Sequence, residues 1–227
     1  MKGSINLALT KVLKGKYSFD YYDKYYKIHS QFPYKEPLNE HFISHNILLF
    51  KRERNHTICQ TNTEIRFSEV PFLSPMSSAF KFYGKPYQYS VYKLNNLILS
   101  IVAYNNNISA ERNKTVLYFI NNELMLGEYI FYDITEKKYH EIFLQYLYKK
   151  YLHNEAGTAE VIYIEDHNKN LLCVNWNGFD LSLKYLFSNV YDYMDDFKSY
   201  YNTTWKFNVE KENSGSAEFM DIPGVFE

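Results

Sequence analysis

Residues Tyr87–Asp133, YQYSVYKLNNLILSIVAYNNNISAERNKTVLYFINNELMLGEYIFYD, decide the fold of this chain. β-Branched and aromatic residues dominate four runs in this stretch, and Asn-rich segments separate them. The runs are VYKL, LILSIVAY, TVLYFI and LMLGEYIFY. Residues of this kind favour strands, and Asn tolerates the positive φ that tight hairpin turns require. The stretch therefore predicts an antiparallel meander.

Helices are predicted on both sides of this meander. Short ones are expected over residues 4–14, where Gly15 can end the helix, and over residues 75–83. A long helix is expected over residues 135–152. Its apolar residues recur at helical spacing and form the predicted buried stripe, which consists of Ile142, Phe143, Tyr146 and Leu147.

Further strands are predicted over residues 160–187, where Asn177-Gly178 separates two apolar runs and is a strong hairpin signal. Short strands are also expected at residues 57–59 and 64–67, and one near the C-terminus at residues 204–209. The expected fold class is therefore α+β: an antiparallel β-meander sheet packed against one long helix and shorter helices.

Three segments are expected along the chain. Residues 1–69 form an N-terminal extension or subdomain, residues 70–210 the main α+β domain, and residues 211–227 a polar, mobile C-terminal tail. No Gly/Ser-rich linker marks the first boundary.

The composition narrows the classes of function. The 227 residues include 25 basic and 26 acidic side chains, so there is no basic excess to bind a phosphate backbone. No stretch approaches the roughly 20 apolar residues of a membrane span. We therefore expect neither a nucleic-acid nor a membrane partner. The 24 Tyr and 17 Phe side chains can fill the hydrophobic core, and Tyr can also form a binding surface that combines apolar contacts with hydrogen bonds.

The chain has two cysteines, Cys59 and Cys173, which lie in different segments. A single disulfide is possible, but no export signal is recognisable, so free thiols in a reducing cytoplasm are the expected state. We predict a cytoplasmic protein.

Part of the chain resembles a known architecture. Residues 65–131 contain a predicted helix that ends in Phe82-Tyr83-Gly84-Lys85-Pro86, then a Tyr-containing strand and TVLYFINNELMLGEY. This order resembles the small α/β domains of the β-lactamase-inhibitor-protein-like and SmpA/OmlA outer-membrane lipoprotein families. The resemblance implies a helix on an antiparallel sheet, used in those families for binding. The lipidated cysteine of the lipoprotein families is absent from the N-terminal region, and no functional residue carries over.

Histidines provide one candidate for chemistry. His41 and His45 are four residues apart and share a face of a helix or of a strand, so they could bind a metal with His56 or Glu40. The order is Glu-His-x-x-x-His and lacks the metalloprotease arrangement. Surface or half-buried histidines are the simpler interpretation.

Two acidic motifs provide the other candidates for chemistry. Tyr193-Met194-Asp195-Asp196 spells the magnesium-binding motif of reverse transcriptases, but its flanks favour an acidic helix start or turn. The segment 166–170, Asp-His-Asn-Lys-Asn, fits the first half of a calcium-binding loop. The Gly and Glu that such a loop needs are replaced by Leu171 and Asn177, so we interpret the segment as a hairpin turn.

These observations favour a non-catalytic cytoplasmic protein-binding module of the immunity, inhibitor or adaptor kind, with no cofactor and no assigned catalytic or metal residue. The alternative is a small metal-dependent hydrolase or nuclease. It would use one of two groups of side chains, His41/His45/His56 or Asp192/Asp195/Asp196.

Overall fold

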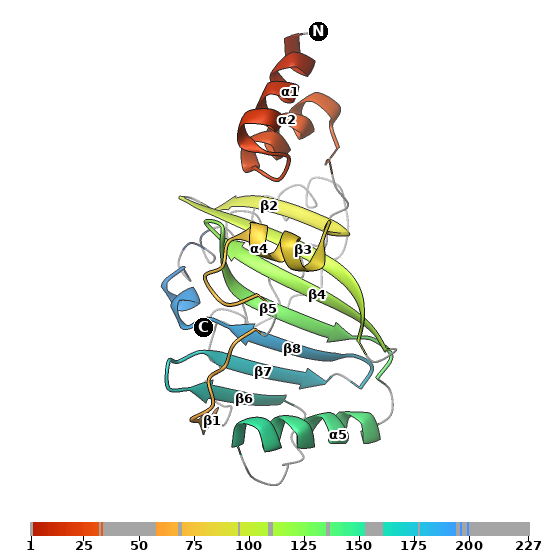
Figure 1. The fold of residues 1–227 in the computed structure, drawn as a ribbon, viewed down its shortest axis with the longest axis vertical. Coiled ribbons are helices and arrows are strands. Elements are labelled where there is room, and N and C mark those ends of the chain that lie inside the picture. Colours follow the sequence, from red (N-terminus) through yellow and green to blue (C-terminus); the bar gives the residue numbers. More distant parts are fainter. Residues whose placement is uncertain are drawn as a thin grey trace, which may run out of the picture.

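A computed structural model describes residues 2–31, 33, 58–67, 70–94, 96–108, 111–134, 137–152, 161–176, 178–193, 196 and 199. In these residues eight strands form one sheet, in the order β1-β6-β7-β8-β5-β4-β3-β2 (Figure 1). Helices accompany the sheet, and all its described strand pairs except one are antiparallel. The fold is therefore α+β, as predicted.

The predicted meander forms one half of the sheet. It follows α4 (Met76–Tyr83) and comprises β2 (Gln88–Leu94), β3 (Leu97–Ile108), β4 (Glu111–Ile120) and β5 (Glu123–Phe131). Gly84 ends α4 with a positive φ of 78°. Asn121 and Asn122 form the turn between β4 and β5, and both have positive φ, as the hairpin prediction requires.

The other half of the sheet comprises β6 (Val161–Asp166), β7 (Leu171–Trp176) and β8 (Leu181–Leu186). These strands also match the predicted runs. β8 pairs with β5 from Leu126↔Leu186 to Phe131↔Leu181, and this pairing, the β5–β8 seam, joins the two halves. β1 (Ile58–Thr61) runs parallel to β6 at the far edge.

The predicted long helix differs from the one in the structure. The long helix expected over residues 135–152 is instead α5 (Lys137–Leu147) followed by the π-helical turn η1 (Tyr148–Leu152). The Thr61 hydroxyl donates to the Tyr151 carbonyl and the Thr63 hydroxyl to the Lys150 carbonyl at 3.4 Å, so η1 is tied to the end of β1. The longest described helix is α1 (Lys2–Lys14), which has 13 residues.

Two helices precede the sheet. α1 is followed by α2 (Phe19–His29), whose N-cap Ser18 accepts a hydrogen bond from the Tyr21 backbone N–H. Gly15, at a φ of 86°, makes the turn between the helices possible. The Tyr-rich segment of α2 shows no clean period in the sequence and was not predicted to be helical.

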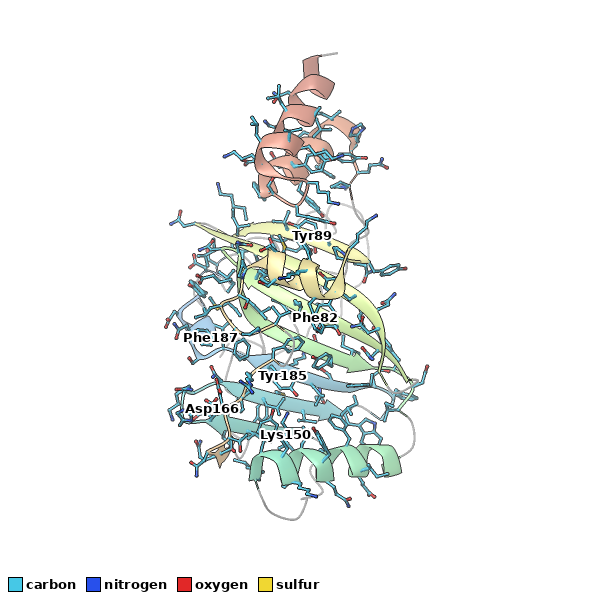
Figure 2. The ribbon with its side chains drawn as sticks, in the orientation of Figure 1. Phe82, Tyr89, Lys150, Asp166, Tyr185 and Phe187 are labelled. Atoms are coloured by element: carbon cyan, nitrogen blue, oxygen red, sulfur yellow. The ribbon has the colours of Figure 1, made fainter. Side chains whose placement is uncertain are left out.

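The larger core lies on the face of the sheet that α4 and α5 cover. Phe67 is fully buried there and stacks on Tyr129 at a ring-centroid distance of 4.7 Å. The ring of Tyr185, a residue labelled in Figure 2, makes a T-shaped contact with Phe67 at a centroid distance of 5.6 Å. Gly127 lies beneath this ring, and a Cβ at that position would overlap Phe67. A second buried cluster lies on the opposite face, around Ile101, Val116 and Leu186.

Four predictions need correction or lie outside the described residues. Residues 64–67 are not a strand, because Ile65 and Phe67 cross over the sheet as irregular chain. In α5 the predicted buried stripe is partly wrong: Leu144 and Leu147 are buried, whereas Ile142 and Tyr146 are 52% and 59% exposed. The strand expected at residues 204–209 and the tail over 211–227 lie outside the described residues.

The domain boundary predicted at residue 69 stays a prediction. β1 belongs to the same sheet as the strands that follow it, because it pairs with β6 from Ile58↔Tyr163 to Thr61↔Asp166. Among the described residues, no helix has the length and apolar character needed to cross a membrane.

Candidate functional site

The histidines singled out in the sequence, His41, His45 and His56, lie outside the described residues. Of the acidic group, Asp195 also lies outside, Asp192 is exposed and Asp196 is half-buried. The described part of the chain contains no group of three or more His, Cys, Asp or Glu side chains that could hold a metal ion. The hydrolase or nuclease alternative stays a prediction.

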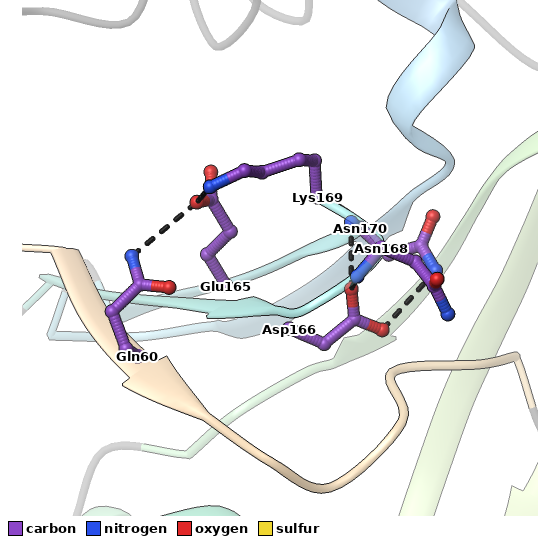
Figure 3. Close-up of polar contacts among 6 residues, drawn as sticks. All are labelled: Gln60, Glu165, Asp166, Asn168, Lys169 and Asn170. Carbon is purple, nitrogen blue, oxygen red and sulfur yellow. Dashed lines mark hydrogen bonds and ion pairs between the residues drawn. The ribbon is translucent and has the colours of Figure 1, made fainter.

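The segment with partial likeness to a calcium-binding loop is the hairpin turn between β6 and β7, as predicted (Figure 3). Asp166 is fully buried, and both oxygens of its carboxylate accept hydrogen bonds from protein groups. Oδ1 accepts the backbone N–H groups of Asn168 and Asn170, both at 2.9 Å. Oδ2 accepts the Ile65 backbone N–H at 2.8 Å and the Asn170 side-chain amide at 3.2 Å. The role of Asp166 is structural.

A buried polar pair lies on the sheet face opposite α4 and α5. Glu128 on β5 and Lys184 on β8 are register partners across the seam, with Lys184 Nζ 3.6 Å from Glu128 Oε1. The Ser182 hydroxyl donates to the same oxygen at 2.6 Å, whereas Glu128 Oε2 is buried and has no hydrogen-bond partner in the described part of the chain. Both charged side chains are almost completely buried.

Cys173 lies next to this pair, because β7 places it opposite Lys184. Burial raises the pKa of its thiol to about 11, although Lys184 and a hydrogen bond with Tyr163 act to lower it. A thiol of this kind is protonated near neutral pH and is a poor nucleophile. Both cysteines are free, as predicted, and β1 and β7 place them on separate strands.

A different kind of site is present at the N-terminal end. α1 packs on α2 through polar side chains, because Lys24 on α2 donates to Asn6 Oδ1 at 3.2 Å. Within α1 the Thr10 hydroxyl donates to the Asn6 carbonyl at 2.8 Å. The Lys24 ammonium also donates to the Thr10 hydroxyl at 2.9 Å. Thr10 is only 6% exposed. The polar side of α1 is thus the side that packs.

The apolar side of α1 faces solvent. Leu9, Val12 and Leu13 are 53%, 83% and 73% exposed, and we call these three side chains the apolar ridge. They are spaced three and four residues apart, so they share one face of the helix. This orientation is the reverse of that expected for a surface helix, which buries its apolar stripe against the domain.

Aromatic contacts hold the hairpin of α1 and α2 against the sheet. Tyr89 on the edge strand β2 contacts the rings of Tyr17 and Tyr22 at centroid distances of 5.1 and 6.0 Å, and its hydroxyl donates to the Tyr17 carbonyl. Tyr17 also packs on Phe80 of α4 at 4.5 Å. Figure 1 shows the hairpin at one end of the molecule, beyond β2, with α5 at the opposite end.

A pocket of about 470 Å³ lies at the foot of this hairpin. The turn between α1 and α2 supplies one wall, and α4, β3 and the β4–β5 turn supply the others. We call it the hairpin pocket. Its lining consists of Lys14, Tyr17, Ser18, Phe19, Met76, Ile98, Ser100, Asn121 and Asn122.

Comparisons with known proteins found no relative: no family model, no curated protein and no solved structure matches the chain. The likeness of residues 65–131 to the inhibitor and lipoprotein domains stays a prediction. The arrangement that it implies, a helix followed by antiparallel strands, is present as α4 and β2–β5.

Sequence reasoning located the helix of residues 4–14 but not the side on which it packs. The signal for the packing side is the pair Asn6 and Thr10. These polar residues are four apart, so they lie on one face of the helix, and both accept hydrogen bonds from Lys24. The buried Glu128–Lys184 pair was missed as well. A charged residue inside each of two central apolar runs, LMLGEYIF and LSLKYL, was the available signal for it.

Proposed function

We propose that this chain is a non-catalytic cytoplasmic protein-binding module of the immunity, inhibitor or adaptor kind, and that its contact surface is the apolar ridge on α1. The observation that carries the proposal is the packing of α1 through Asn6 and Thr10, which leaves Leu9, Val12 and Leu13 in solvent. Contiguous exposed apolar side chains on a soluble domain are typical of an interaction surface.

The spacing of the ridge suits a known mode of recognition. An amphipathic helix can place side chains at i, i+3 and i+4 into an apolar groove of a partner, and these are the relative positions of Leu9, Val12 and Leu13. Burying three aliphatic side chains contributes about 1.5–3 kcal/mol each before the costs of association are subtracted. The ridge therefore supplies an apolar anchor, to which the other contacts of the interface add.

The hairpin also has the rigidity that a binding surface needs. The rings of Tyr17 and Tyr22 pack on Tyr89, so α2 is anchored to β2 while α1 is anchored to α2 through Lys24. A surface that is already ordered loses less conformational entropy on binding. The resemblance to inhibitor-type binding domains supports the same kind of role.

The experiment is an affinity pull-down from the source cell with mass-spectrometric quantification of partners. The wild type is compared with the triple variant L9Q/V12Q/L13Q, because Gln keeps good helix propensity while removing the apolar surface. The matched control is I142Q/Y146Q, which removes two exposed apolar side chains from α5 at the opposite end of the molecule. Circular dichroism checks that all three proteins fold.

We expect a stoichiometric protein partner that the wild type and the α5 variant retain. The ridge variant should recover at least about tenfold less of this partner, since each loss of about 1.4 kcal/mol weakens binding tenfold. The absence of any stoichiometric partner, or equal recovery by the ridge variant, would contradict the proposal.

A further inference from the structure

We infer that the hairpin pocket is a binding site for a small organic anion, a carboxylate or a phosphate ester that carries an apolar or aromatic body. This goes beyond the proposed protein-binding role, because the pocket and the apolar ridge are different surfaces. The inference depends on the volume of the pocket, on the hydrogen-bonding character of its lining and on its charge.

The two asparagines of the β4–β5 turn line the pocket and carry side-chain donors. Asn121 Oδ1 accepts the Ile98 backbone N–H at 3.0 Å, and Asn122 Oδ1 accepts the Met76 backbone N–H at 3.2 Å. A backbone N–H can bond only to the oxygen of a side-chain amide, so both amide groups are held in one orientation. Their NH₂ groups are left to donate, and both side chains are exposed where they line the pocket.

The turn itself fixes these side chains. Asn121 and Asn122 have φ values of 49° and 72°, and the Asn121 backbone N–H donates to the Ile98 carbonyl at 2.9 Å. Asn121 and Ile98 are therefore joined by two reciprocal hydrogen bonds. These hydrogen bonds hold the side-chain amides of the β4–β5 turn in place, so their donors need little reorganisation to meet a ligand.

The charge of the lining is positive. Among the described residues that line the pocket, Lys14 is the single charged one and none is acidic. Two acidic residues follow lining residues in the chain, Asp20 after Phe19 and Glu123 after Asn122, but both are exposed and neither lines the pocket. An ammonium and two amide donors select a negatively charged acceptor group.

The apolar lining residues determine which ligand body fits the pocket. Tyr17, Phe19, Met76 and Ile98 are the apolar lining residues, and two of them are aromatic. A volume of about 470 Å³ lies within the range of sites that bind small molecules, roughly 300–1,000 Å³. Apolar walls with a few placed polar groups are also typical of such sites.

The test uses four probes with the same ring and different charge. Benzoate and phenyl phosphate represent the two anion classes, benzyl alcohol is the neutral control and benzylammonium the cationic control. Binding to the full chain is measured by isothermal titration calorimetry and by saturation-transfer NMR. We expect the two anions to bind at least about tenfold more tightly than the alcohol or the ammonium, which corresponds to one bidentate or charge-assisted contact.

Two variants locate the site. K14Q removes the charge, and N122D keeps an oxygen to accept the Met76 backbone N–H while replacing the donor with a second acceptor. Each should weaken benzoate binding about tenfold, since each removes a contact of about 1.4 kcal/mol. K11Q is the matched control, because it makes the same charge change on α1 at a residue that does not line the pocket. Thermal unfolding confirms that the variants fold.

Three results would overturn the inference. They are equal affinity for benzyl alcohol and benzoate, unchanged benzoate affinity in both K14Q and N122D, and no detectable binding of either anion at millimolar concentration. The relative affinities of benzoate and phenyl phosphate distinguish a carboxylate site from a phosphate site.

Discussion

Asp166 and Ile65, which are 101 residues apart in the chain, are joined by a 2.8 Å hydrogen bond from the Ile65 backbone N–H to the buried carboxylate. This bond connects the β6–β7 turn to the segment that carries Phe67 over the core. Asn170 reinforces it, because its side-chain amide donates to the same carboxylate while its oxygen accepts the Ser188 backbone N–H at 3.1 Å.

D166N should destabilise the protein by about 2–3 kcal/mol. The substitution puts an NH₂ group where the carboxylate accepts N–H donors on both oxygens, so buried donors lose their acceptor. Urea denaturation measures the effect. D23N is the control, because it removes only the solvent-exposed ion pair with Lys27 and should cost no more than about 0.5 kcal/mol. Equal unfolding midpoints for the two variants would refute the structural role of Asp166.

G127A should cost about 1–3 kcal/mol by overpacking, because a methyl group at this position would overlap the Phe67 ring. In the F67L background the cost should be smaller, since the shorter side chain leaves room. A double-mutant cycle built from unfolding free energies measures this coupling. If the changes in unfolding free energy for G127A and F67L are additive, the two positions are not in steric contact.

K184M should destabilise the protein by about 3–5 kcal/mol, because it leaves the buried Glu128 carboxylate without its cation. Adding E128Q should recover part of that loss, since the neutral amide can keep the hydrogen bond from Ser182 without a buried charge. Unfolding free energies of the wild type, both single variants and the double variant decide the question. A double variant less stable than K184M would contradict the pairing.

Alkaline pH should weaken the fold partly through Tyr89. Burial raises the pKa of its phenol from 10.0 to about 12, with a contribution from Tyr17, while a hydrogen bond with Ser100 opposes the rise. Between pH 10 and 12 the unfolded phenol releases its proton and the folded one keeps it. The unfolded state then binds fewer protons, so stability falls as pH rises through this window, by up to about 2–3 kcal/mol from this group.

The contribution of Tyr89 is tested by urea unfolding at several pH values from neutral to about 12. The background is C173A, because burial raises the pKa of the Cys173 thiol into an overlapping pH window. The Y89F variant should lose stability with pH less steeply than its parent. Y146F, which changes an exposed tyrosine, is the control and should keep the steeper slope. Parallel curves for Y89F and its parent would remove Tyr89 as a source of the pH dependence.

Sequence patterns predicted the strands well where side-chain alternation and Asn-rich turns coincide, as at Asn121-Asn122 and in the turn after Asp166. They could not predict which strands pair between the two halves of the sheet. β5 is followed in the chain by α5 and β6, yet its partner across the sheet is β8. Such pairings depend on tertiary packing, which local pattern does not encode.

The partly wrong buried stripe of α5 and the unpredicted packing side of α1 have a common cause. Helical spacing identifies an apolar stripe, but the side that packs is decided by what the helix meets. In α5 the buried side is that of Leu144 and Leu147, so Ile142 and Tyr146 stay exposed. In α1 the partner is Lys24, which selects the polar side. The hairpin pocket was equally hidden, because its walls come from four separate parts of the chain.

The β5–β8 seam has a consequence for the order of assembly. Within each half of the sheet, strands that follow one another in the chain lie side by side, so their pairing closes only short loops. The seam brings together residues such as Glu128 and Ser182, which are 54 positions apart, and so carries a larger loop-closure entropy. Each half can form early and independently, and the rate at which the two halves become one sheet is then set by the docking of one strand pair.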